Sequence, residues 1–184
     1  DYGKPGSWAG IAGRDKNGGV KEGDAYFLGI NGGKGQFVGR VYDSNKTSYE
    51  VNAPFSEGVH LLTLSYNGEA HEIYVDGVLK DSKNAAAGAV LSEPATNLTI
   101  GAYSDEEMIN GLNGSYDELQ ISSTGTTEDY EAFRYANYLG NAVTMAPIEA
   151  KDGEIILTVS SPANPALLEA GEVVSSGYVS EDAL

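Results

Sequence analysis

The segment VHLLTLSYNGEAHEIYVDGVLKDS, residues 59–82, is the most informative one for the fold class. Its apolar residues alternate with polar neighbours, which is the period of a half-buried β-strand. An Asn-Gly and an Asp-Gly dipeptide interrupt the alternation, and both favour tight hairpin turns because their residues accept positive φ. The segment therefore predicts a meander of three antiparallel strands, with a core face made of Leu62, Leu64, Ile73 and Val75.

Similar patterns stand on both sides of this meander. The segment AYFLGINGGKGQFVGRVYD, residues 25–43, predicts a hairpin with its loop at Asn31-Gly32-Gly33. Two more strands are predicted at NLTIGAY, residues 97–103, and GSYDELQIS, residues 114–122. We expect the inner faces of these two strands to carry Leu98, Ile100, Leu119 and Ile121.

One short helix and a distinct tail follow. The segment TTEDYEAFRYANYLG, residues 126–140, has Thr126 or Thr127 as the candidate N-cap, acidic residues in its first turn and Gly140 as its end. After residue 145 the composition changes, and one strand pattern at 154–159 precedes two prolines. We expect a β-sandwich over residues 1–145, and a linker with a strand-containing tail, or the start of a following domain, over 146–184.

Composition narrows the class of protein. The chain has 24 Gly and 12 Tyr, which suits a turn-rich all-β protein. A formal net charge of -16 repels phosphate backbones, so nucleic acid is excluded as a partner. The absence of Cys excludes disulfides and cysteine zinc sites. No apolar run approaches the roughly 18 residues that a membrane span needs, so we expect no membrane insertion in this segment.

The order of four short motifs resembles a known family. The motifs are HLLTLSYNG at 60–68, IYVDG at 73–77, LTIGAY at 98–103 and GSYDELQIS at 114–122. Their order is similar to that of laminin-G-like domains in the concanavalin A-like lectin/glucanase superfamily, and residues 116–143 resemble the ending of bacterial and archaeal surface proteins. The resemblance implies an all-β jelly-roll sandwich of two antiparallel sheets, with one short C-terminal helix and an extended C-terminal segment.

The chain departs from the family pattern in two places. Val59 stands where the family usually has Trp, and only seven residues precede Trp8, where relatives carry leading strands. The resemblance therefore implies an open sheet edge with unpaired backbone groups. Residues 153–160 have the alternation of a strand that could fill such a gap, within this chain or by donation to a neighbouring copy. The linker-like residues before them favour pairing outside the parent sandwich.

Catalytic chemistry finds little support in the residue pattern. The glucanases of this superfamily place two carboxylates on one face of a strand, whereas the acids of this chain cluster at adjacent positions, which point to opposite faces. The chain has two histidines, His60 and His71, and no Gly-x-Ser-x-Gly elbow. We therefore expect no catalytic residue, and structural roles for both histidines.

Two kinds of binding site stay open. Calcium prefers clustered carboxylate and amide oxygens, and the loops offer a candidate Ca²⁺ site at Asp105, Asn110 and Asp117. For Asp117 the alternative is a buried carboxylate that accepts hydrogen bonds from loop amides. A carbohydrate would need an aromatic platform, for which the candidates are Trp8, Tyr42 and Tyr103.

Three functions are compatible with these observations. The first is a non-catalytic binding or adhesion module, for carbohydrate or a surface protein, within a larger secreted or cell-surface protein. The second is a structural subunit of an extracellular filament or surface layer, in which copies of the chain assemble by strand donation. The third is a glycoside hydrolase, which the carboxylate pattern disfavours.

Overall fold

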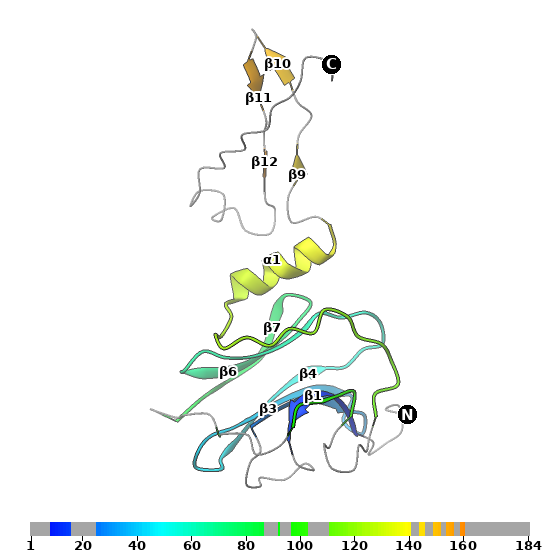
Figure 1. The fold of residues 1–184 in the computed structure, drawn as a ribbon, viewed down its shortest axis with the longest axis vertical. Helices are drawn as coiled ribbons and strands as arrows, with labels where there is room; N and C mark the ends of the chain where they lie inside the picture. Colours follow the sequence, from blue (N-terminus) through cyan, green and yellow to red (C-terminus); the bar gives the residue numbers. More distant parts are fainter. Residues whose placement is uncertain are drawn as a thin grey trace. The chain divides into compact units, whose positions relative to one another are not determined.

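A computed structural model describes residues 8–15, 25–86, 92, 97–102 and 111–140, together with the backbone pairing of four short strands between residues 144 and 160. Its main part is a sandwich of two antiparallel sheets (Figure 1). The chain divides into two compact units, Asp1–Glu131 and Ala132–Leu184. No helix in the described ranges has both the length and the apolar character that crossing a membrane requires.

The larger sheet has five strands in the order β4-β3-β2-β1-β8. The predicted hairpin at 25–43 is confirmed, because β2 pairs with β3 in continuous register from Tyr26↔Val41 to Asn31↔Gln36. A β-bulge between Gly10 and Ala12 interrupts the pairing of β1 with β2. The strand bounds are β1 (Trp8–Arg14), β2 (Tyr26–Asn31), β3 (Gln36–Tyr42), β4 (Ser48–Pro54) and β8 (Thr99–Ile100).

The smaller sheet is the predicted meander, in the order β5-β6-β7. Its strands are β5 (Leu62–Tyr66), β6 (Ala70–Val75) and β7 (Val78–Asn84). The second turn has the expected geometry, since Asp76 and Gly77 have φ of 55° and 76°. In the first turn only Gly68 has positive φ, and Asn67 Oδ1 instead accepts the N–H groups of Glu69 and Ala70 at 3.0 and 2.9 Å.

The core lies between the two sheets. Ile73 and Val75 are buried as predicted, and Leu62 and Leu64 are partly buried against the same cluster. The sheets approach closely at Gly39, where a Cβ would lie 2.6 Å from Leu64 Cδ1. Strand alternation sends every second side chain into this layer. The buried members of the cluster are Ala9, Ile30, Phe37, Val51, Ala53, Ile73 and Val75.

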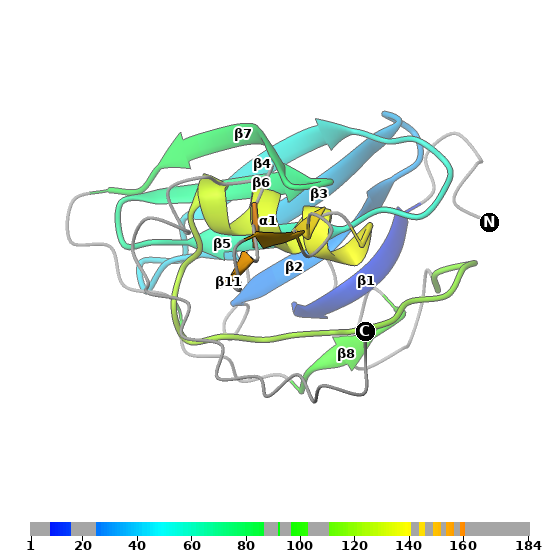
Figure 2. The same ribbon diagram turned by 90° about the horizontal axis from the view of Figure 1, so that it is seen from above.

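The sandwich has one closed and one open side. On the closed side, where β4 and β7 lie together, Asp81 Oδ2 accepts the N–H of Asn52 at 3.0 Å. On the open side, β8 and β5 are the outermost strands of their sheets, and no further strand flanks them in the described part of the chain. Residues 111–127 cross the open side from one sheet to the other (Figure 2).

The strand predicted at 114–122 is wrong, because residues 111–127 contain no strand. The strand predicted at 97–103 is shorter than expected, since β8 has only two residues. Both segments lie at the open side: β8 pairs with β1 over only two residues, and residues 111–127 do not pair with the outer edge of either sheet in the described structure. The inward orientation predicted for four of their residues is also wrong: Leu98 and Ile100 are each 38% exposed, Leu119 47% and Ile121 58%.

The predicted helix is α1 (Glu128–Tyr138). Thr127 is its N-cap, because its Oγ1 accepts the N–H of Tyr130 at 3.3 Å. Glu128 and Asp129 stand in the first turn, where the helix dipole favours negative charge. The helix ends at Tyr138, and Gly140 follows two residues later with φ of 73°, the left-handed conformation that favours glycine after a helix.

The C-terminal strands pair with one another. β10 (Glu149–Lys151) pairs with β11 (Glu154–Ile156), and β9 (Thr144–Met145) pairs with β12 (Val159–Ser160), both antiparallel. The strand pattern predicted at 154–159 thus forms β11, whose partner is a segment of the same chain. A domain boundary at residue 145 stays a prediction.

Candidate functional site

Exposed apolar side chains gather on the open side. Tyr116, Leu119 and Ile121 lie on residues 111–127, which we call the crossing segment. Ile100 lies in β8, and Leu98 directly precedes that strand. We call these five residues the open-side row. Each is at least 38% exposed. Exposed apolar groups that cluster in this way, rather than singly, are typical of an interaction surface.

The start of the crossing segment is fixed to the larger sheet. Leu112 packs against the core, and its N–H donates to the carbonyl oxygen of Gly101 at 2.9 Å. Tyr116 reaches back to the same glycine, because a Cβ on Gly101 would lie 2.6 Å from the Tyr116 hydroxyl oxygen. Gly101 has φ of 75° and donates its own N–H to Ile11. Glycine is therefore required at this position for both its conformation and its lack of a side chain.

The end of the crossing segment is fixed to the smaller sheet. The N–H of Thr126 donates to Ser65 Oγ at 3.0 Å. Glu131 is 1% exposed, and its carboxylate accepts the hydroxyl groups of Thr63 at 2.7 Å and Thr126 at 2.8 Å. A buried carboxylate with both oxygens satisfied holds its partners in place. The open-side row is therefore held between two anchored ends.

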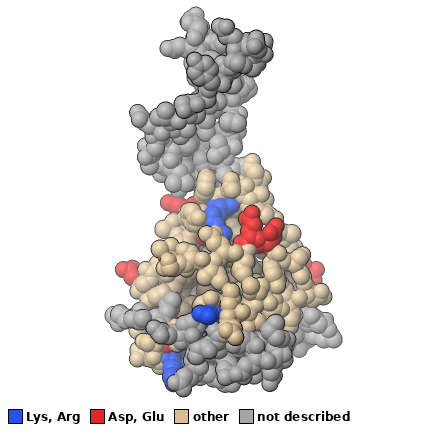
Figure 3. Space-filling view, viewed as in Figure 1, with Lys and Arg blue, Asp and Glu red and all other residues tan. Residues whose placement is uncertain are grey.

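The charges near the open-side row are negative. Residues 97–102 and 111–129 contain Asp117, Glu118, Glu128 and Asp129 and no Lys or Arg. β5 and the turn after it add Glu69 and again no base. Figure 3 shows one face of the molecule, on which the described charged side chains form separate small patches on a largely uncharged surface.

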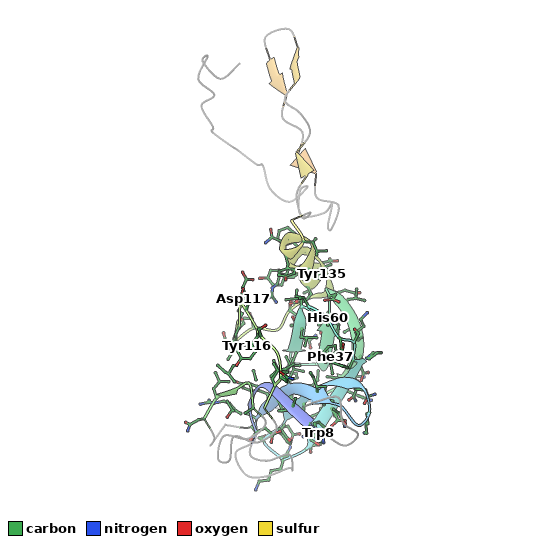
Figure 4. All side chains as sticks on the ribbon, turned by 90° about the vertical axis from the view of Figure 1, so that its right-hand side faces the viewer. Trp8, Phe37, His60, Tyr116, Asp117 and Tyr135 are labelled. Carbon is green, nitrogen blue, oxygen red and sulfur yellow. The ribbon has the colours of Figure 1, made fainter. Side chains whose placement is uncertain are left out.

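Two of the three aromatic residues proposed for carbohydrate binding, Trp8 and Tyr42, lie on the outer face of the larger sheet. Trp8 is partly exposed, and the Arg40 guanidinium lies 5.6 Å from its ring centroid. Figure 4 shows Trp8 on the opposite side of this sheet from Phe37, which points into the core. Tyr103 lies outside the described residues. Successive side chains of a strand point to opposite faces of the sheet, and Arg40 and Phe37 are three residues apart on β3. Arg40 therefore lies on the outer face with Trp8, and Phe37 lies on the core face.

Tyr42 is 1% exposed, and this placement does not favour it as a platform for a ligand. Its hydroxyl donates to Asp15 Oδ2 at 3.1 Å and accepts from Arg40 Nη1 at 3.3 Å. Burial, followed by the charge of Asp15, raises the pKa of Tyr42 well above its usual range. Arg40 also donates to Glu50 at 2.8 Å. Arg40 is not among the site residues expected from the sequence, where its only signal is a base within an apolar strand.

The residues proposed for calcium are described only in part. Asp105 and Asn110 lie outside the described residues. Asp117 is exposed, and its Oδ1 accepts the N–H of Glu118 at 2.8 Å, so it is not the buried carboxylate of the alternative reading. That role belongs to Asp43, which is 3% exposed and accepts two loop N–H groups and the Tyr49 hydroxyl. Within the described ranges, no group of three or more metal-binding side chains is found.

Ser56, His60 and Asp76 form a chain of hydrogen bonds. Ser56 Oγ lies 3.1 Å from His60 Nε2, and His60 Nδ1 lies 2.8 Å from Asp76 Oδ2. This is the order of a nucleophile, base and acid in a hydrolase triad. Asp76 Oδ1 also accepts the N–H of Leu61 at 3.0 Å, which links the strand entry to the β6–β7 turn. Ser56 is exposed on its loop.

His71 is buried in the core between two tyrosine rings. It is 1% exposed, and its ring stacks on Tyr49 at 4.6 Å and on Tyr66 at 4.5 Å. Neither ring nitrogen has a hydrogen-bond partner in the described structure. Burial lowers the pKa of His71, and the charge of Asp43 opposes this shift. The structural role expected for this histidine is therefore one of stacking.

The comparisons with known proteins identify the class. A family model described as "Concanavalin A-like lectin/glucanases superfamily", the Laminin_G_3 family, matches residues 3–129. The chain belongs to this family, as the resemblance implied. No curated protein matches the chain.

Among solved structures, one that matches is residues 221–444 of an S-layer domain-containing protein from Clostridium thermocellum. The identity is 16% and the TM-score 0.35, over 66% of this chain and 59% of that one. The match thus spans less than two thirds of the solved chain.

Proposed function

We propose that this chain is a non-catalytic binding module of a secreted or cell-surface protein, and that it binds another surface protein through its open side. The observation that carries this proposal is the open-side row, with its central residues Tyr116, Leu119 and Ile121 each at least 47% exposed. Membership of a superfamily whose members range over carbohydrate binding, adhesion and protein binding agrees with it. Aromatic and aliphatic residues at the centre of a patch are typical of protein interfaces.

The anchoring of the row supports binding without a large ordering cost. Gly101 and Glu131 fix the two ends of the crossing segment, so its side chains are positioned before a partner arrives. A pre-positioned surface loses less conformational entropy on binding. We expect binding to concentrate in the aromatic and aliphatic members of the row, while the acidic neighbours tune the rate of association.

A triple variant tests this function. Tyr116→Ser, Leu119→Ser and Ile121→Ser together remove three of the five residues of the open-side row. We expect binding to immobilised proteins from a cell-surface extract to fall by tenfold or more, about 1.4 kcal/mol or above. The matched control is Val59→Ser with Val78→Ser, two side chains that are 78% and 50% exposed elsewhere. Circular dichroism checks the fold of both. Equal binding by the triple variant and the control contradicts the proposal.

Carbohydrate is the second candidate ligand, and Trp8 is the observation that favours it. Trp8 is the one Trp of the chain, is partly exposed and contacts the Phe27 ring in a T-shaped arrangement as well as the Arg40 guanidinium. A partly exposed indole held in place in this way is a candidate platform on which a sugar could stack. A glycan array with and without Ca²⁺, repeated with Trp8→Ala, tests this ligand; binding that persists in the variant places the sugar elsewhere.

The absence of catalysis needs its own experiment because of the Ser56–His60–Asp76 chain. We expect no labelling of the protein by a fluorophosphonate, a reagent that modifies activated serines. Ser56→Ala is the matched control. Labelling that this substitution and Asp76→Asn both abolish would show an activated serine and would overturn the non-catalytic assignment.

A further inference from the structure

We propose that the open side binds its partner as an added β-strand, and that the strand is an extended segment of another polypeptide with alternating apolar residues and basic flanks. The inference rests on the proposed function, since it names the partner of the same surface. Its basis is the combination of a sheet edge with no further strand beside it in the described ranges, an alternating apolar segment nearby and a predominance of acidic residues in the surrounding segments.

The first feature is the outer edge of β5, which carries backbone hydrogen-bonding groups. β5 (Leu62–Tyr66) pairs with β6 on one side, and no strand lies on its other side in the described structure. The outermost strand of a sheet presents N–H and C=O groups that can template a further strand. On the closed side the corresponding edge of β4 faces β7, and Asp81 already accepts the N–H of Asn52. On the open side Gly125 and Thr126 contact the C-terminal end of β5, and no strand of the described ranges pairs with the rest of its outer edge.

The crossing segment supplies the side-chain part. Leu119 and Ile121 are two residues apart, so an extended chain here would place both on one face. The sequence has the alternation of a strand, yet no strand forms, and both side chains are about half exposed. An added strand between this segment and β5 would provide the missing ladder and cover these side chains. Strand order would then form on binding, as in other β-addition complexes.

The charged residues around the open side indicate the charge of the partner. Asp117, Glu118, Glu69, Glu128 and Asp129 lie in the segments around the open side and outnumber the bases of the adjoining elements, Arg14 at the end of β1 and Arg134 in α1. Opposite charges on the flanks of a partner strand favour its approach and its correct placement. A second copy of this chain is a poor occupant, since it brings the same acids and a net charge of -16.

Peptide selection tests the inference directly. The full chain is used to select from a library of random twelve-residue peptides, with the Leu119→Ser, Ile121→Ser variant as counter-selection. We expect enriched peptides to alternate apolar residues and to carry Lys or Arg at their ends. Enrichment of peptides without alternation, or no enrichment above background, overturns the inference.

Two controls use the best selected peptide. A version N-methylated at alternate residues keeps every side chain but loses N–H donors, and we expect it to bind at least tenfold more weakly; equal binding overturns strand pairing. The double variant Asp117→Asn, Glu118→Gln should weaken binding by about fivefold at low salt. Unchanged affinity in this variant would contradict the inference that the partner strand carries basic flanks.

Hydrogen exchange separates strand addition from other modes of docking. We expect the bound peptide to protect backbone amides of residues 62–66 and 114–122, because both would enter a ladder. Protection absent from both segments overturns the inference even where the peptide binds. The proposed function and strand addition can fail separately. If the triple variant loses surface-protein binding but the selection yields no alternating peptides, the open side still binds protein, and strand addition is overturned. Sedimentation showing concentration-dependent dimers that the triple variant abolishes would make a second copy the occupant.

Discussion

The closed and the open side of the sandwich share one sequence pattern, the alternation of apolar residues, but differ in structure. On the closed side, β4 and β7 are full strands of seven residues, and a side chain of one bonds to the backbone of the other. On the open side, β8 has two residues, and the segment after it has none in a strand. Alternation of apolar residues is present on both sides. The difference shows that alternation alone does not make a strand, and that the backbone must also pair with a neighbouring strand.

The largest contrast is expected from two isoleucine truncations. Ile73 on β6 is fully buried, so Ile73→Ala should lower the free energy of unfolding by about 2–5 kcal/mol. Ile121 is 58% exposed, so Ile121→Ala should change it by less than about 0.5 kcal/mol. Urea denaturation measures both. Equal losses of unfolding free energy in the two variants would mean that Ile121 is buried in solution.

The contact that closes the sandwich gives the next effect. Asp81→Ala removes the acceptor of the Asn52 N–H and should cost about 1–2 kcal/mol in urea denaturation. Asp81→Asn is the matched control, since its amide oxygen can still accept and the loss should be smaller. If both variants are as stable as the wild type, this hydrogen bond does not hold the two edges together.

The buried histidine predicts a pH dependence. The pKa of His71 is lower in the folded chain than its ordinary value of 6.5, so below that pH the unfolded state binds the proton more readily. Stability should therefore fall as the pH is lowered through 6.5 towards the folded pKa. His71→Phe keeps the stack between Tyr49 and Tyr66, and its urea midpoints should vary less over this range. A variant with the same pH profile as the wild type excludes His71 as the cause.

The smallest expected effect concerns calcium. If loop carboxylates around Asp117 hold Ca²⁺, millimolar Ca²⁺ should raise the melting temperature of the chain by a few degrees, or roughly 1 kcal/mol. Asp117→Asn should reduce this shift, and Mg²⁺ serves as the control ion. Calorimetry with neither heat nor thermal shift removes the calcium site.

Local patterns were sufficient for much of the fold. The alternation around Ile73 and the Asp76-Gly77 turn predicted the meander, because these signals act over a few residues. Thr127 and Gly140 likewise fixed the helix ends from local chemistry. The family resemblance added the two-sheet architecture.

Properties that depend on distant segments were not accessible in this way. The sequence pattern of Leu119 and Ile121 is that of buried strand residues, and their exposure depends on which edges are adjacent in space. The same holds for Arg40, whose partners Asp15 and Glu50 come from other parts of the chain. The Ser56–His60–Asp76 chain also spans a loop and a hairpin turn, so no short motif could reveal it.

The blocked edge at Asp81 also limits the stoichiometry of any assembly. A filament built by sheet extension needs every subunit to offer two compatible edges, one to receive and one to give. Here the β4 edge is already engaged by β7, and the unflanked outer strands of the described ranges, β5 and β8, both lie on the open side. A strand added there would leave no matching edge on the closed side for the next subunit. Such an arrangement favours discrete complexes over a filament that grows from both sides of each subunit.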